Sequence, residues 1–424
     1  MSAIREKKLH HSTLERGMNG IKTLRSMVRF LLMFSLPLAV TSCGGEGRSA
    51  GGTAGAGIVA SLELEAAYPE AFSYLSGVRE LPDGRLLAAD PLSQVLLRVD
   101  LDAGAADTLG RVGGGPEEYR QPDHVFPLPG DSSLLVDLGK TYLTVVAPDG
   151  TFQGGMSMAL TTEDGPPAII MPEAVDGTGR LYSQGMMSFG EGPSDSLQVS
   201  RYDRATGESE TVASLWRTEP IVSRSGNNVS MTRPRMVAND DYAVGADGRV
   251  AVVRANGYFV EWHMPSGDVV TGPETPYEVI PISHADKEAD LAESTGAGLG
   301  ISIMRDASGG TQMQMQRGGF GGGGGEGPSV EEETWGENFP PFRNQRTVVS
   351  PANDVWVLRW LPADREPMMD VFGPDGGLKG SVIIPRGRRL IGFGEGPEGA
   401  DVAYFVRTDE VDLQWLERYR VIWG

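Results

Sequence analysis

The sequence of 424 residues contains a single cysteine, Cys43, so the chain cannot form an internal disulfide bond. Histidine is also scarce, with five in all. Three of them, His124, His263 and His284, follow Cys43, and none lies at metal-ligand spacing from another. The sequence has no Gly-x-Ser-x-Gly or His-Glu-x-x-His motif, which marks many hydrolases and metalloproteases. The residue types present therefore predict no catalytic residue.

Positive charge is in the minority: 37 Lys and Arg residues stand against 57 Asp and Glu residues, a net charge of -20. The first 42 residues hold seven of the basic and two of the acidic residues, so 30 basic and 55 acidic residues remain. Such a body is repelled by the phosphates of nucleic acids and by an anionic membrane surface. The composition therefore argues against a nucleic-acid partner, and solubility accounts for the acidic surface.

Long apolar runs are missing too, apart from one near the start. The run "FLLMFSLPLAV" at 30–40 follows a basic leader and precedes Thr41, Ser42 and Cys43. It is too short for a membrane-spanning helix and has the layout of an export signal. The stretch "LAVTSC" resembles the cleavage site of bacterial lipoproteins, which implies lipidation of Cys43. The alternative is an ordinary signal peptide with a chance cysteine.

With cleavage before Cys43, the sequence predicts three parts: a signal peptide at 1–42, a Gly-rich tether at 43–56 and a folded body at 57–424. Gly44 after the cysteine is compatible with sorting to the outer membrane. We therefore expect a protein of the cell envelope, lipid-anchored and either periplasmic or surface-exposed.

A repeated pattern fills the folded body. Each unit has a turn, a strand of apolar or β-branched residues, a short polar break, a second strand and, in most units, a second Gly turn. The two turns are 20 residues apart in the first two units (Gly84 to Gly104, Gly130 to Gly150). The units lie at 81–104, 128–150, from 174, 243–267, 350–376 and 396–423.

Six antiparallel units at a pitch of roughly 45 residues predict an all-β fold, a six-bladed β-propeller with four-stranded blades. The last unit has room for only three strands before Gly424. The segment "GIVASLELEAA" at 57–67 alternates like a strand. We expect it to close the ring by pairing with the C-terminal blade, which removes an exposed strand edge.

The run "GRVGGGPEEYRQPDHVFPLPGDSSLLVDLGKTYLTVVAPDG" resembles an NHL-type repeat. The matching residues are Gly113, Gly115, Glu118, Tyr119, Pro122, Asp137, Asp149 and Gly150. The chain is similar to NHL-like six-bladed propeller lipoproteins of bacteria, most of which have no assigned activity. The motif weakens after the second unit, where Gly185, Arg254, Trp360 and Val406 lie at or near the aspartate position. The Gly-rich loop itself, followed by acids rather than Lys-Ser, predicts a sharp link between blades with positive φ, and not a phosphate site.

The ends of the second strands are expected to share one face with the outer-to-inner connections between blades. These ends are Asp90, Asp137, Gln184, Arg254, Arg359 and Arg407. Arg254, Arg359 and Arg407, with Gln184, are the candidate ligand-binding residues, because guanidinium groups suit carboxylate or sulfate. The alternative is that these arginines form ion pairs with Asp or Glu residues of neighbouring blades. Asp90 and Asp137 are weak candidates for calcium ligands, and capping of the turn by each carboxylate is the alternative.

The longest insertion, at about 281–343, lies on the same predicted face. Residues 283–294 predict a short helix capped by Ser283, residues 309–333 are low in complexity and predict disorder, and residues 337–344 should dock on the propeller. We expect a non-enzymatic, monomeric binding or scaffold propeller without a cofactor that presents this face to a protein, peptide or glycan. The alternative is a calcium-dependent hydrolase or lyase at the channel mouth.

Overall fold

The computed structural model describes residues 57–424 except 161–167, 185–186, 189–195, 226–227, 297–298, 306–310, 318–328, 397–398 and 400. The predicted signal peptide and tether, with Cys43, lie outside the described residues. The described residues belong to one compact unit, Thr53–Gly424. No helix among them is long and apolar enough to cross a membrane.

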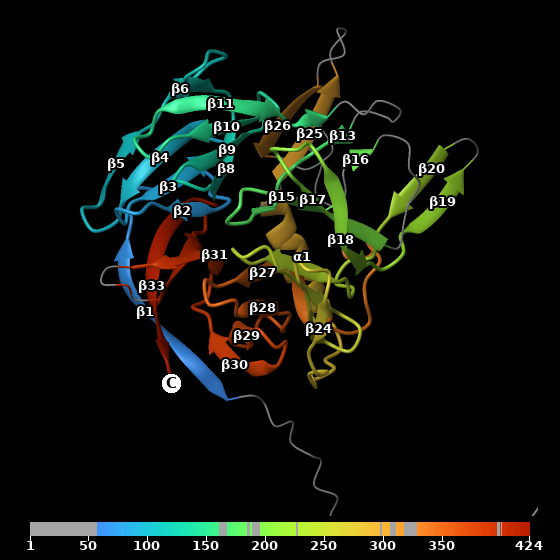
Figure 1. Cartoon of the computed structure of the whole chain (residues 1–424). Helices are drawn as coiled ribbons and strands as arrows, with labels where there is room; N and C mark the ends of the chain where they lie inside the picture. The colour runs from blue at the N-terminus through green and yellow to red at the C-terminus, as the bar shows by residue number, and fades with distance from the viewer. Residues whose placement is uncertain are drawn as a thin grey trace, which may run out of the picture. The chain divides into compact units, whose positions relative to one another are not determined.

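Six four-stranded antiparallel blades follow one another around a ring, as the repeats predicted (Figure 1). Blade one contains β2 (Val78–Glu80), β3 (Leu86–Asp90), β4 (Val95–Asp100) and β5 (Ala105–Thr108). Blade two contains β8 (Pro122–Pro127), β9 (Ser133–Asp137), β10 (Tyr142–Val146) and β11 (Phe152–Ser157). Blade three contains β14 (Ala174–Val175), β15 (Leu181–Gln184), β17 (Ser196–Tyr202) and β18 (Ser209–Trp216). Blade four contains β21 (Asp241–Val244), β22 (Val250–Arg254), β23 (Phe259–His263) and β24 (Val269–Thr271).

Blades five and six belong to one eight-stranded sheet, because β1 (Ile58–Ala67) lies between them. Blade five contains β27 (Phe342–Val349), β28 (Val355–Arg359), β29 (Met368–Phe372) and β30 (Leu378–Ile383). Blade six contains β31 (Arg388–Glu395), β32 (Asp401–Thr408), β33 (Gln414–Trp423) and β1 as its outer strand. The predicted closure of the ring by residues 57–67 is confirmed. In addition, β1 pairs in parallel with β30, from Ile58 opposite Ser381 to Ala60 opposite Val382.

The innermost strands surround the axis of the ring. Each contacts the innermost strand of the next blade, in the order β2, β8, β14, β21, β27, β31 and back to β2. The second strands lie one step further out and are buried on both faces, as in "LLAAD" of β3 and "SLLVD" of β9. Neighbouring blades therefore cover both faces of each sheet, which explains why these strands are continuous apolar runs.

The Gly-rich loop links β5 to β8 and carries two short parallel strands, β6 (Arg111–Val112) and β7 (Glu118–Tyr119). The Glu118 carboxylate accepts the Gly115 N–H at 2.5 Å, so the loop binds an anion of its own chain. Of its glycines only Gly110 has a positive φ, of 66°. At Gly113 a Cβ atom would clash with the Glu118 side chain. The expectation of positive φ through this loop is therefore wrong for residues 113–115, where glycine provides space. Tyr119 is buried between blades one and two.

Further elements lie outside the blades. These are the sheet of β12 (Ala159–Leu160), β13 (Ala168–Ile169) and β16 (Met187–Ser188), the hairpin of β19 (Ile221–Ser225) and β20 (Asn228–Thr232), and, in the insertion, α1 (His284–Gly296), β25 (Leu299–Arg305) and β26 (Thr311–Arg317). The Ser283 side chain caps α1 by accepting the Asp286 N–H at 3.2 Å, as predicted. Residues 311–317, expected to be disordered, form β26 instead. The alternation in "TQMQMQ" has the period of a strand.

Candidate functional site

The second strands end where the turn pattern predicted. Five of the six named residues are the last residue of their strand, and Arg407 is the last but one of β32. In chain order the ends are Asp90, Asp137, Gln184, Arg254, Arg359 and Arg407. Their position alone does not make them a binding site, because each side chain has its own contacts.

Arg254 and Gln184 are both occupied by neighbouring side chains. The Arg254 guanidinium lies 2.7 Å from Asp240 and 2.6 Å from Glu261. The Gln184 side-chain oxygen accepts a hydrogen bond from Arg217. Neither residue lines a pocket shared with Arg359 or Arg407. The four candidates therefore do not converge, because second strands lie outside the inner ring and blades three and four are remote from blade six.

Arg359 and Arg407 line two different pockets, which share Arg386, Arg388 and Thr408 at the junction of blades five and six. Arg359 is 3.7 Å from Asp370, and Arg407 is 3.1 Å from Glu417. The acids come from the third strand of the same blade, and not from a neighbouring blade, because the third strand pairs directly with the second. The Arg407 guanidinium also lies over the Trp415 ring, 4.2 Å from its centroid.

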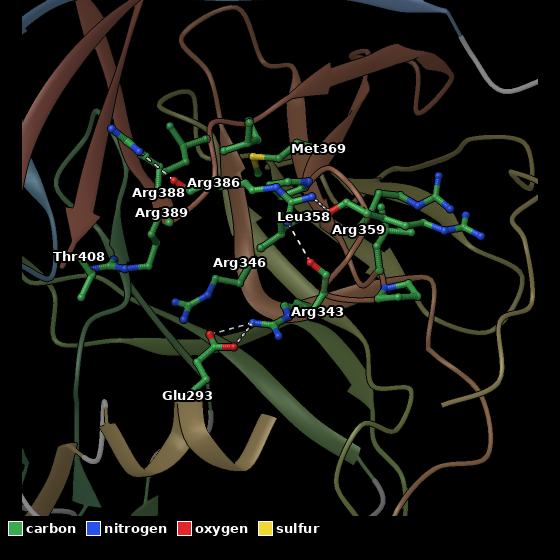
Figure 2. Close-up of a pocket in the computed structure, with 18 of the residues that line it drawn as sticks. Glu293, Arg343, Arg346, Leu358, Arg359, Met369, Arg386, Arg388, Arg389 and Thr408 are labelled. Atoms are coloured by element: carbon green, nitrogen blue, oxygen red, sulfur yellow. Dashed lines mark hydrogen bonds and ion pairs between the residues drawn. The ribbon is translucent and has the colours of Figure 1, made fainter. Parts of the chain in front are cut away.

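A pocket of about 660 Å³ opens between these two blades. Its walls come from α1, β27, the loop after β28 and the link from β30 to β31 (Figure 2). We call it the arginine pocket. Seven arginines line it: Arg343, Arg346, Arg359, Arg365, Arg386, Arg388 and Arg389. Two acids, Glu293 and Asp412, line it as well. The pocket lies on the face that carries the second-strand ends and the insertion.

Two of these arginines lack a neutralising carboxylate in the part of the chain that the structure describes. Among the described residues, no carboxylate lies within 4.0 Å of the guanidinium group of Arg346 or Arg389. Arg389 donates to the carbonyl oxygens of Leu75, at 2.6 Å, and Ser76, at 3.4 Å. Burial lowers the pKa of Arg389 to about 10, and burial also lowers the pKa of Arg346. Both guanidinium groups remain charged at neutral pH.

Helix α1 brings one carboxylate into the arginine pocket. Glu293 accepts two hydrogen bonds from Arg343 Nη1, at 2.8 and 2.9 Å, and Figure 2 shows this pair beside Arg346. The Arg343 guanidinium also lies over the Trp360 ring, 5.1 Å from its centroid. The helix therefore neutralises one arginine of the pocket with an acid of its own.

A second, more open pocket of about 730 Å³ adjoins the first on blade six. Arg386, Arg388 and Thr408 line both pockets, and Arg407 lines the outer one. The buried Glu417 carboxylate accepts from Arg388, at 3.1 and 3.3 Å, and from Arg407, at 3.1 Å. One acid thus positions two arginines and leaves one net positive charge.

The innermost strand β8 carries a titratable pair, Asp123 and His124, on which the charge of Arg389 acts. His124 Nδ1 lies 2.5 Å from Asp123, whose other oxygen accepts from Ser76 at 2.8 Å. Burial lowers the pKa of His124, but the Asp123 carboxylate outweighs it, so the pKa lies above its usual value. Glu173, from the start of blade three, also acts on His124, and burial raises the pKa of Glu173.

The carboxylates of Asp90 and Asp137 accept backbone N–H groups, both from the turn after their own strand and from the segment that leads into the innermost strand of the blade. Asp90 accepts the N–H groups of Ser73, Leu92 and Ser93 at 2.6, 3.0 and 2.9 Å. Asp137 accepts those of Arg120, Gln121 and Lys140 at 3.0, 2.9 and 3.2 Å. This is the geometry of the turn-capping alternative. No group of three or more His, Cys, Asp or Glu side chains suited to a metal ion occurs in the described part of the chain.

Sequence reasoning missed Arg346, Arg388 and Arg389, which lie on innermost strands. Two short stretches carried a signal: "FRNQR" at 342–346 and "PRGRRL" at 385–390 concentrate arginine in an acidic chain. The second stretch is the link between blades five and six, the class of connection that was expected on the binding face.

Comparison with protein-family models finds no match, and no curated protein matches either. Solved structures similar to this chain include a member of the duf4221 family from Bacteroides vulgatus (9% identity, TM-score 0.43, covering 86% of this chain and 99% of that one). A second is a calcium-binding regucalcin from Agrobacterium tumefaciens (11% identity, TM-score 0.37, covering 87% of this chain and 97% of that one). A third is a virginiamycin B lyase from Staphylococcus aureus (10% identity, TM-score 0.37, covering 85% of this chain and 99% of that one). At these sequence identities and TM-scores, the similarity to these structures says nothing about the function of this protein. The protein is a six-bladed β-propeller by its own strand pairing, and the NHL-like family resemblance stays a prediction.

Proposed function

We propose that this protein is a binding propeller of the cell envelope, anchored by a lipid on Cys43, which takes anionic groups of its ligand into the arginine pocket. The observation that supports this most strongly is the pair of guanidinium groups on Arg346 and Arg389. Both are half-buried, and neither has a carboxylate partner among the described residues.

An unpaired charge in such a position costs free energy, because protein replaces part of its hydration shell. A carboxylate, phosphate or sulfate offsets this cost with charge-assisted hydrogen bonds, which are about twice as strong as neutral ones. The planar guanidinium group also selects the geometry of these anions. A site built from two such groups therefore favours an anionic ligand over a neutral one.

The net charge of the whole chain further limits the kind of ligand that can bind. With a net charge of -20, the protein repels a large acidic surface at long range. A small anionic group that reaches the arginine pocket meets a local excess of positive charge instead. The proposal is therefore a site for an anionic group on a small or slender ligand.

Calorimetric titration of the full chain with citrate, a compact tricarboxylate, tests this proposal. Citrate should bind to the wild type, and the double variant Arg346→Gln/Arg389→Gln should weaken binding at least about a hundred-fold, because two charge-assisted contacts are lost. Arg254→Gln is the matched control, since Arg254 lies outside both pockets and should leave binding unchanged. If the wild type does not bind citrate, or the double variant binds it equally well, the proposal is wrong.

A further inference from the structure

We infer that the ligand is a linear acidic oligosaccharide, with one carboxylate on each sugar, lying across both pockets from the channel to the rim of blade six. This inference rests on the proposed function and names the chemistry of its ligand. The first observation is continuity: Arg386, Arg388 and Thr408 line the arginine pocket and the outer pocket alike. The two pockets thus form one groove.

Arginine side chains are spread along this groove, and carboxylates neutralise part of their charge: Arg386 lies 3.3 Å from Glu366, and Glu417 is shared by Arg388 and Arg407. Arg346 and Arg389 lie at its inner end, where β27 and β31 surround the channel. Arg386 and Arg388 lie at the shared middle, and Arg407 lies in the outer pocket. A compact anion would contact the inner pair alone. A chain with repeated carboxylates contacts the middle and the outer arginines too.

The arginines are held in place before a ligand arrives. Glu417 fixes Arg388 and Arg407 side by side, and Arg386 donates to the carbonyl oxygens of Ala363 and Arg365 at 2.9 and 2.8 Å. Rigid donors suit rigid acceptors, because less conformational entropy is lost on binding. A carboxylate on a sugar ring is such an acceptor. A glutamate side chain in an acidic peptide has more rotatable bonds and loses more rotamer freedom when it becomes ordered.

Hydrogen-bond acceptors line the outer pocket beside the arginines. They are Glu410 and Asp409, whose Oδ1 already accepts the N–H groups of Val411 and Leu413. Carboxylates repel a uniform polyanion but accept hydrogen bonds from hydroxyl groups. A uronate chain offers hydroxyls between its carboxylates. Leu358, Leu361 and Pro362, which are half-buried, add apolar surface for the C–H faces of sugar rings. The lining therefore favours an acidic sugar over an acidic peptide.

Calorimetric titration of the full chain with galacturonic acid and its di-, tri- and tetrasaccharide tests this inference. Affinity should rise about ten-fold or more from the monomer to the trisaccharide as further arginines are reached. Arg407→Gln should lower the affinity for the tetrasaccharide about ten-fold and leave the affinity for the monomer unchanged. Arg386→Gln serves as a second variant, because Arg386 is half-exposed and its loss leaves no buried acid unpaired.

Three results would overturn the inference. The first is equal affinity for monomer and tetrasaccharide while citrate still binds in the arginine pocket, which leaves the proposed function standing. The second is equal or tighter binding of tetraglutamate, which makes the ligand an acidic peptide. The third is equal binding of uncharged tetragalactose. Failure of the wild type to bind citrate would instead overturn the proposed function, on which this inference rests.

Discussion

The arginines of this protein fall into two groups, according to whether carboxylates neutralise them. Arg418 is buried and lies 3.2 Å from Glu65 and 2.6 Å from Asp102. Arg389 lies in a cavity and donates only to carbonyl oxygens among the described residues. The same side chain therefore stabilises the fold at one position and is available to a ligand at the other.

Substitution of these two arginines should separate stability from binding. Arg418→Gln removes the buried ion pairs of Arg418 with Glu65 and Asp102, although Glu65 keeps its ion pair with Arg420, and should cost about 1–3 kcal/mol of unfolding free energy, with unchanged citrate affinity. Arg389→Gln removes an uncompensated charge but also the hydrogen bonds to the carbonyl oxygens of Leu75 and Ser76. These opposing effects should keep the change in unfolding free energy below about 1 kcal/mol, and citrate binding should weaken about ten-fold or more. Urea denaturation and calorimetry measure the two effects. The reverse pattern would show that Arg389 is structural.

His124 should make stability depend on pH. The charged groups around it are Asp123, Arg389 and Glu173, and their sum places its folded pKa above the usual 6.5. A raised pKa stabilises the folded state fully below about pH 6.5, and this contribution is lost as the pH rises through the folded pKa. The stability advantage of wild type over His124→Gln should therefore be larger at pH 6 than at pH 9. Urea denaturation at both values measures it, and an advantage that grows with pH would contradict the assignment.

At the scale of elements, β1 joins two blades. It pairs with β33 over most of its length and with β30 at its first residues, so one strand connects blade five to blade six. Without it, the edges of β30 and β33 would both be unpaired, and Ile383, Ile422 and Trp423 are already partly exposed there. Unpaired strand edges promote aggregation.

Truncation tests this role of β1. A chain that begins at residue 57 keeps β1 and should melt and elute like the full-length body. A chain that begins at residue 68 lacks it and should melt at a lower temperature and aggregate. Thermal denaturation and size-exclusion chromatography compare the two. Equal melting temperatures and monomeric elution for both would mean that β1 does not stabilise the ring.

Helix α1 should act on binding through Glu293. Its carboxylate neutralises Arg343 inside the arginine pocket, so Glu293→Gln frees a third guanidinium group for the ligand. Citrate affinity should then rise about three- to ten-fold. Glu288→Gln on the same helix is the control, because Glu288 is exposed and, within the described residues, its ion pair is with the exposed His284. Weaker binding of citrate to Glu293→Gln would show that Glu293 orients Arg343 for the ligand instead.

The blades could be predicted from the sequence because turn residues and strand periodicity are local. The closing role of 57–67 followed from counting strands in the last unit. The site was predicted only in part. Arg359 and Arg407 lie in the groove, but the free charges on Arg346 and Arg389 depend on which acids the folded ring brings near them. Arg254 shows the same limit, since its partner Asp240 precedes it by 14 residues and no pattern in the sequence links the two.

At the scale of the whole molecule, we propose that the acidic body and a lipid anchor on Cys43 act together. On this proposal, the charge would keep the propeller from lying flat on an anionic bilayer, and the lipid would hold it close to the membrane. Replacement of Cys43 by Ala should leave the propeller folded, because no disulfide is possible, and should move the protein from the membrane fraction to the soluble fraction. Fractionation with immunoblotting measures this. Continued sedimentation with membranes would reveal a second anchor.

The location of the binding face is the central claim, and amide hydrogen exchange tests it most directly. The full chain is compared with and without saturating citrate, since bound ligand slows exchange where it stabilises the backbone. We predict slower exchange in 342–346 and 385–390, the segments that carry Arg346 and Arg389, and no change in blades two to four. Unchanged exchange in both segments, with protection elsewhere on the ring, would contradict the account.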